Sequence, residues 1–178
     1  MTTFWNLLLA SLISNTVVAT ILTLIFRRKT EEITAEVKNQ FERNLTTFKS
    51  SYQWKEKSVA ELLGQLYLQF NRTKRAFGRY NDTNLYLEAK VIKDGNEKIR
   101  DLLLDKAYLI PTALIEDANK LIEHYDVWLE EFYKQRDSET PNLNQKFVFA
   151  GPKGYGFPSV SETKFKEKYL EFWKDLYA

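Results

Sequence analysis

The organisation of this chain is decided by the stretch FWNLLLASLISNTVVATILTLIF, residues 4–26, which contains no charged side chain. Its 23 residues would form a helix of roughly 34 Å, which is enough to cross a hydrocarbon core of about 30 Å. A cleaved signal peptide would need a basic start, a shorter apolar core and a small-residue cleavage site, and this sequence has none of these. We therefore predict a retained transmembrane helix over residues 4–26.

Basic residues next to this stretch predict its orientation. Arg27, Arg28 and Lys29 follow it at once, whereas no lysine or arginine precedes it. Because positively charged flanks stay on the cytoplasmic side, we expect residues 1–3 to lie outside and residues 27–29 to form a cytoplasmic flank. Residues 30–178 would then form a cytoplasmic domain on a single-pass anchor.

Small and polar side chains recur at four-residue steps within the predicted span, at Ser11, Asn15, Ala19 and Thr23. This spacing places them on one face of a helix, where such residues let helices approach closely and form hydrogen bonds. An unpaired amide near the bilayer midplane is costly, so Asn15 is expected to face sister copies or water. These residues would then line a pore whose cytoplasmic mouth carries Arg27 and Arg28. In the alternative, the hydroxyl groups bond back to their own helix and Asn15 is tolerated.

Composition limits the chemistry that the rest of the chain can perform. The chain has 178 residues, no cysteine, a single histidine and a formal net charge of +2. The absence of cysteine rules out disulfides and thiolate metal sites, and one histidine rules out a multi-histidine metal site. We expect no metal and no cofactor. The roughly 150 residues after the span are enough for one domain with its own core.

Apolar residues after the span recur at steps of three, four or seven, which is the period of an amphipathic helix. The pattern predicts a long helix over residues 30–77 and shorter helices over about 84–107, 112–135 and 160–177. Pro111 separates two of them, and residues 137–160 are irregular, with a possible short strand at 147–149. Ser159 and Glu162 have the spacing of a capping box. The predicted fold is all-α: an N-terminal transmembrane helix followed by a cytoplasmic helical bundle.

His124 is the only histidine and therefore the main candidate for acid–base chemistry. One interpretation is a surface or half-buried histidine whose ring is satisfied by Glu123 or Asp126. A second interpretation pairs His124 with Asn119, which lies five positions earlier and about 140° around the helix. In that case the two side chains would converge only in a groove between subunits.

Two other stretches could contact partners. Basic residues cluster near the end of the predicted long helix, at Arg72, Lys74, Arg75 and Arg79. They could meet phosphates, although a solvated helix end explains them as well. The glycine-rich stretch GPKGYGF, residues 151–157, does not match a phosphate-binding loop and is interpreted as a loop that exposes Tyr155 and Phe157.

The charge-free span, the long aromatic helix and the polar-x4-His element Asn119–His124 together resemble a known family. It is the small accessory transmembrane protein encoded with the RNA-guided RNase of type VI-B CRISPR systems, which has a divergent HEPN domain. HEPN ribonucleases carry an arginine four to six residues before the histidine and act as dimers. In this sequence Asn119 stands at the arginine position and Lys120 is the nearest cation. The resemblance therefore implies a divergent HEPN-like bundle in which RNA cleavage is in doubt.

The resemblance implies a function at the bacterial inner membrane. The chain would be an oligomeric pore-forming accessory protein that depolarises the membrane and enhances RNA-guided antiphage defence. Its partners would be inner-membrane lipid, a functionally associated RNA-guided RNase, and sister copies in a ring, with eight as one candidate number. Direct RNA binding stays open. Two alternatives remain: a membrane-tethered HEPN-type ribonuclease that uses His124, and a membrane scaffold that forms no pore.

Overall fold

The computed structural model describes residues 2–79, 84–138, 140, 141, 143, 147, 149 and 156–178, without the side chains of residues 2 and 7–16. The described residues form helices and connecting loops, and none of them is in a strand. The all-α class is therefore as predicted. The chain divides into two compact units, Met1–Ser50 and Ser51–Ala178.

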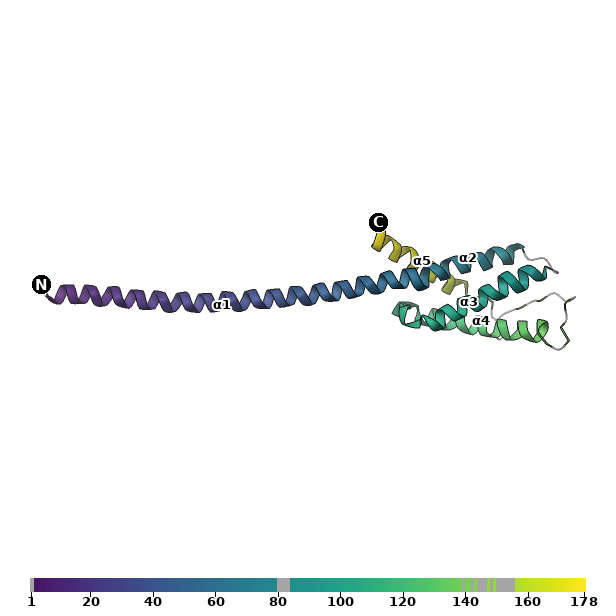
Figure 1. The fold of residues 1–178 in the computed structure, drawn as a ribbon, viewed down its shortest axis with the longest axis horizontal. Helices are drawn as coiled ribbons and strands as arrows, with labels where there is room; N and C mark the ends of the chain where they lie inside the picture. Colours follow the sequence, from purple (N-terminus) through teal and green to yellow (C-terminus); the bar gives the residue numbers. More distant parts are fainter. Residues whose placement is uncertain are drawn as a thin grey trace. The chain divides into compact units, whose positions relative to one another are not determined.

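The first unit consists of one helix. Helix α1 spans Thr2–Lys57, so it supplies all of the helical residues of this unit and the first residues of the second (Figure 1). Every side chain described in the first unit is exposed, including the apolar stripe that the sequence assigned to the bundle. The sequence predicted a bundle from residue 30, whereas the compact unit begins at Ser51. Helical periodicity shows which residues share a face, but it does not show what covers that face.

The second unit begins with the last residues of α1, which continue into α2, and it contains three more long helices. A π-helical turn, Ser58–Leu63, leads into α2, Gly64–Arg79, so no loop interrupts the backbone there. The remaining elements are a π-helical segment Leu87–Lys93, α3 Asp94–Asp105, 3-10 turns Ala107–Leu109 and Thr112–Leu114, α4 Ile115–Arg136 and α5 Ser159–Tyr177. Pro111 lies between the two 3-10 turns, and the residue before it is extended, as the proline ring requires.

The four helices of this unit pack as a bundle. Helix α2 contacts α3 and α5, and α4 contacts the same two helices (Figure 1). Their apolar faces form one main core, which includes Leu62, Leu66, Phe70, Ile99, Leu103, Leu121, Tyr125 and Phe165. A second cluster near the end of α4 contains Ala76, Leu87, Ile92, Trp128, Leu129, Phe132 and Phe147. The predicted helical bundle is therefore confirmed for residues after Ser51.

Two local predictions are wrong. Phe147 and Phe149 are not in a strand, and Phe147 instead packs edge-on against Trp128 and Phe132 at ring-centroid distances of 5.1 and 5.6 Å. Val148 lies outside the described residues. Ser159 does not cap α5, because the N-cap position is Pro158 and no side-chain cap hydrogen bond forms there. The Glu162 carboxylate is buried and pairs with Lys166 instead.

Gly95 allows α2 and α3 to approach closely. A Cβ atom at this position would lie 2.3 Å from Cγ2 of Thr73, whose hydroxyl is held by the Gln69 and Phe70 carbonyls at 3.0 and 3.2 Å. We expect Gly95→Ala to lower the free energy of unfolding by about 1–3 kcal/mol, because overpacking outweighs the helix propensity that alanine adds. Urea denaturation of the full chain in detergent measures this change.

Gly78→Ala is the matched control, because nothing lies within 4 Å of a Cβ built there. It should leave stability unchanged or raise it by up to about 1 kcal/mol. Adding Thr73→Ser, which removes the colliding methyl group, should recover most of the loss in Gly95→Ala. Equal stability of the two alanine variants would contradict the close approach.

Candidate functional site

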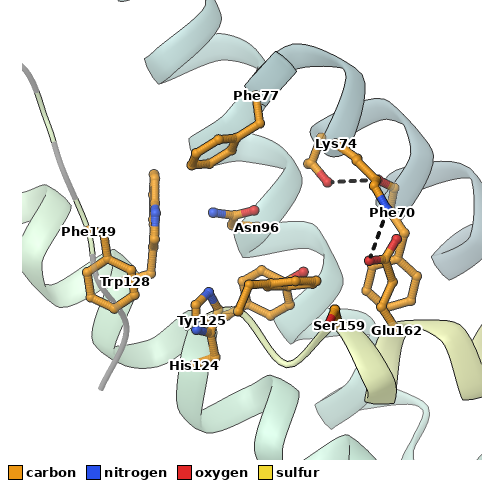
Figure 2. Close-up of a pocket in the computed structure, with 12 residues that line it drawn as sticks. Phe70, Lys74, Phe77, Asn96, His124, Tyr125, Trp128, Phe149, Ser159 and Glu162 are labelled. Atoms are coloured by element: carbon orange, nitrogen blue, oxygen red, sulfur yellow. Dashed lines mark hydrogen bonds and ion pairs between the residues drawn. The ribbon is translucent and has the colours of Figure 1, made fainter. Parts of the chain in front are cut away.

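A cavity of about 350 Å³ lies within the second unit, between α2, α3, α4 and the start of α5. Figure 2 shows its polar groups surrounded by aromatic rings. The rings come from separated parts of the chain: Phe70 and Phe77 on α2, Tyr125 and Trp128 on α4, and Phe149 and Phe157 from the segment before α5. Asn96, His124, Thr73 and Ser159 add polar atoms, and Lys74 and Glu162 complete the lining. This is the type of concave, mainly apolar site in which proteins bind small molecules.

His124 projects from α4 into this cavity. It is 6% exposed, and its Nδ1 atom is buried without a hydrogen-bond partner among the described residues. Three rings approach it edge-on, those of Tyr125, Phe149 and Phe157, at centroid distances of 5.5, 5.3 and 5.2 Å. The structure therefore places this imidazole among aromatic rings.

The expected carboxylate partner of His124 is not present. Glu123 is exposed, and Asp126 is exposed and lies 3.6 Å from the Arg100 guanidinium. Neither carboxylate is among the described residues that line the cavity. The interpretation of His124 as a histidine satisfied by a neighbouring carboxylate is wrong.

The protonation state of His124 follows from this environment. Burial disfavours the charged imidazolium and lowers the pKa of His124 from 6.5 to about 4. The ring is therefore neutral at pH 7, with one nitrogen as a donor and the other as an acceptor. One nitrogen of the ring can donate a hydrogen bond to a ligand and the other can accept one, but the ring does not contribute positive charge.

Asn96 and Trp128 provide the other polar groups of the cavity wall. They are 5% and 2% exposed, and the indole Nε1 of Trp128 is buried without a hydrogen-bond partner among the described residues. The indole is held by stacking on Phe132 at a centroid distance of 5.3 Å and an interplanar angle of 11°. In Figure 2 the Asn96 amide points toward this indole, and the His124 ring points into the same cavity. An amide, an indole N–H and a neutral imidazole thus share one cavity.

Charged groups line only one side of the cavity. The Lys74 ammonium lies 4.0 Å from the Glu162 carboxylate, with side-chain exposures of 73% and 6% (Figure 2). Lys166 pairs with the same carboxylate from the next turn of α5. The buried negative charge is thereby balanced by lysines, and the other lining residues that the structure describes are uncharged.

The two residues of the predicted ribonuclease element are not brought together. Asn119 is exposed on α4, whereas His124 is buried, and Lys120 is also exposed. Within the described part of the chain, no three acidic or histidine side chains gather in a way that could hold a metal ion. Arg72, Arg75 and Arg79 are exposed, and of the predicted basic cluster only Lys74 lines the cavity.

The predicted pore-lining residues lie on α1 of the first unit. The side chains of Ser11 and Asn15 are outside the described residues. Ala19 and Thr23 are exposed, and the Thr23 hydroxyl donates to the Ala19 carbonyl at 2.8 Å, as the alternative interpretation of the stripe expects. Arg27 and Arg28 are exposed, and Arg27 pairs with Glu31 at 2.9 Å.

Within the part of α1 and the other helices that the structure describes, no segment combines the length and the apolar character needed to cross a bilayer.

Several cavity residues were not found from the sequence. Asn96 and Trp128 were not singled out. Phe157 is exposed, as expected, but its ring also lines the cavity, which was not expected. The spacing of His124 and Trp128 on α4 was the available signal, because positions i and i+4 lie on one face of a helix. Asn96 and Phe157 come from other elements, and no local pattern predicts that they meet this face.

Comparison with known proteins gives no family assignment: no protein-family model matches the chain, and neither the curated proteins nor the solved structures contain a significant match.

Proposed function

We propose that the chain is a self-associating membrane protein in which residues 4–26 cross the bilayer and sister copies surround a pore. The observation that carries the proposal is a continuous exposed apolar surface at the end of this stretch. Val17, Val18, Ile21, Leu22, Leu24, Ile25 and Phe26 are all exposed on α1. A group of exposed apolar side chains such as this one is characteristic of surfaces that contact lipid or other protein chains. Arg27–Lys29 follow directly, as at the cytoplasmic end of a membrane helix.

The apolar surface of α1 continues beyond the predicted membrane boundary and supports self-association. Phe26, Val37 and Phe48 are exposed and are spaced eleven residues apart. An 11-residue repeat corresponds to about 3.67 residues per turn, which keeps a stripe on one face of helices in a right-handed supercoil. Sister copies fit this face because each carries the same stripe in the same register.

The polar face of the span supports a pore within such an assembly. Ser11, Asn15, Ala19 and Thr23 would face the axis, where Asn15 would meet water or sister amides. The pore would be weakly selective, because no charged side chain lies between residues 4 and 26. The resemblance to CRISPR accessory proteins supports a role in depolarising a bacterial inner membrane alongside an RNA-guided RNase.

The ribonuclease alternative receives less support from the geometry. Cleavage of RNA needs a donor at the scissile phosphate beside a general acid or base. His124 is neutral and enclosed by aromatic rings, and Asn119 points away from it into solvent. We therefore do not propose RNA cleavage, and the scaffold alternative is distinguished by the following experiment.

We expect overproduced full-length protein to fractionate with bacterial membranes and to depolarise them, as reported by a potential-sensitive dye. Asn15→Leu should fractionate in the same way but should not depolarise, because it removes the polar group predicted at the pore midplane. Val17→Leu, on the opposite face of the helix, is the matched control and should behave like the wild type. The detergent-solubilised wild type should have a mass above that of a dimer.

Different results would overturn different parts of the proposal. Recovery of the wild type in the soluble fraction would overturn the membrane anchor. Membrane association without depolarisation, or full depolarisation by Asn15→Leu, would overturn the pore and favour the scaffold.

A further inference from the structure

The cavity around His124 contains two buried polar atoms that no described side chain or backbone group satisfies. Nδ1 of His124 and Nε1 of Trp128 both lack a hydrogen-bond partner among the described residues. A buried polar atom left unpaired costs about 1–3 kcal/mol, so two of them beside one cavity are better explained by a ligand than by packing. Asn96, which is also buried, adds an amide donor and acceptor to the same space (Figure 2).

The size and charge of the cavity restrict the class of ligand. Its volume of about 350 Å³ is near the lower end of the range of small-molecule sites, roughly 300–1,000 Å³, and favours a small ligand. Of the described lining residues, only Lys74 and Glu162 carry charge, and these lie 4.0 Å from each other. A ligand that occupies the interior would therefore be neutral.

The wall chemistry restricts the ligand further. Rings of Phe77, Tyr125, Phe149 and Phe157 supply flat apolar surfaces from different sides. Aromatic side chains stack on the faces of planar ligands, and each stacked nucleobase contributes about 1–3 kcal/mol. The Asn96 amide and the Trp128 N–H match the adjacent donors and acceptors on the edge of a nucleobase, for which asparagine is a common partner.

We infer that the cavity of the bundle binds a free purine or pyrimidine nucleoside, with the base enclosed by the aromatic rings and its polar edge directed at Asn96, His124 and Trp128. This site is separate from the proposed pore, because every lining residue belongs to the unit Ser51–Ala178. The protein would thus combine a membrane-facing helix with a domain that recognises a small metabolite.

The first test measures binding to the full-length protein in detergent by equilibrium dialysis with adenosine, guanosine, cytidine and uridine. At least one nucleoside should bind with a dissociation constant below about 1 mM. Asn96→Leu and Trp128→Phe should each weaken that binding by about tenfold or more, since each removes a hydrogen bond to the base. Asn119→Leu and Trp173→Phe change the same residue types at exposed positions and should leave binding unchanged.

A second measurement uses the wild type and does not depend on the stability of any variant. The chain has four tryptophans, so ¹⁵N labelling gives four indole N–H signals. Addition of the bound nucleoside should shift the signal of Trp128, which is assigned by its loss in Trp128→Phe. The signals of Trp5 and Trp173 should stay in place.

Three results would overturn the inference. The first is the absence of binding by all four nucleosides. The second is binding that shifts other indole signals but leaves that of Trp128 in place. The third is equal binding of indole or benzene by wild type and Asn96→Leu together with no nucleoside binding, which would show a purely apolar cavity.

Discussion

Arg136→Leu is expected to lower the free energy of unfolding by about 3–5 kcal/mol, because it removes a cation that pairs with a buried carboxylate. The Arg136 guanidinium donates to both carboxylate oxygens of Glu88 through Nε and Nη2, the latter at 3.1 Å. The two side chains are 5% and 4% exposed, so solvent does not replace the lost partner. This pair joins the last turn of α4 to the π-helical segment Leu87–Lys93, and urea denaturation of the full chain measures its loss.

Two controls separate the charge effect from a change in packing. The double variant Glu88→Leu/Arg136→Leu removes both charges and should recover a large part of the stability, because apolar side chains can replace a buried ion pair. Lys134→Leu removes an exposed lysine that pairs with Glu130 and Glu131, and it should change stability by less than about 0.5 kcal/mol. A loss in Arg136→Leu no larger than in Lys134→Leu would contradict the importance of the buried pair.

The all-α class could be predicted because amphipathic periodicity is a local property of the sequence. The same periodicity could not show where the bundle begins. Val37 and Phe48 continue the pattern of Val59 and Phe70, yet the first two are exposed on α1 and the last two lie in the core. Burial depends on which other elements are within reach, and that information is not present in a single stripe.

Local sequence rules did not predict the roles of Gly95 and Glu162, because both residues make tertiary contacts that such rules do not consider. Gly95 lies inside the predicted helix 84–107, where glycine lowers helix propensity, but its missing side chain admits Thr73 of the neighbouring helix. Glu162 was interpreted as part of a capping box, whereas its carboxylate pairs with Lys166 beside the cavity. In both cases the residue type was informative, but its partner comes from a contact that the local rule does not consider.

The candidate site could be predicted only as a single residue. His124 was identified because it is the only histidine, but its environment was assigned from neighbours in sequence, Glu123 and Asp126. The actual neighbours include Asn96 from α3 and Phe157 from the segment before α5. A cavity assembled from four elements depends on how those elements pack, so a sequence pattern alone does not define it.

The burial of His124 predicts an acid-dependent loss of stability with a defined sign. Desolvation lowers the pKa of this ring to about 4 in the folded protein, whereas the unfolded chain titrates near 6.5. Between these values the unfolded state binds more protons than the folded state, so stability falls as pH falls from about 6.5 to about 4. The contribution of this one residue reaches about 3 kcal/mol at the acid end, since each pKa unit corresponds to about 1.4 kcal/mol.

His124→Gln isolates this contribution, because glutamine is polar and does not titrate. Urea denaturation of wild type and variant at pH 7, 6, 5 and 4.5 should show stability decreasing more steeply in the wild type. Carboxylates such as Asp117 also lose their partners in acid. Burial favours the neutral acid there, but hydrogen bonds from Lys164 and Ser161 outweigh it and lower the pKa of Asp117, so its contribution is present in both proteins. The difference between the two curves therefore reports His124 alone, and parallel curves would show that the folded protein accepts a charged imidazole in this cavity.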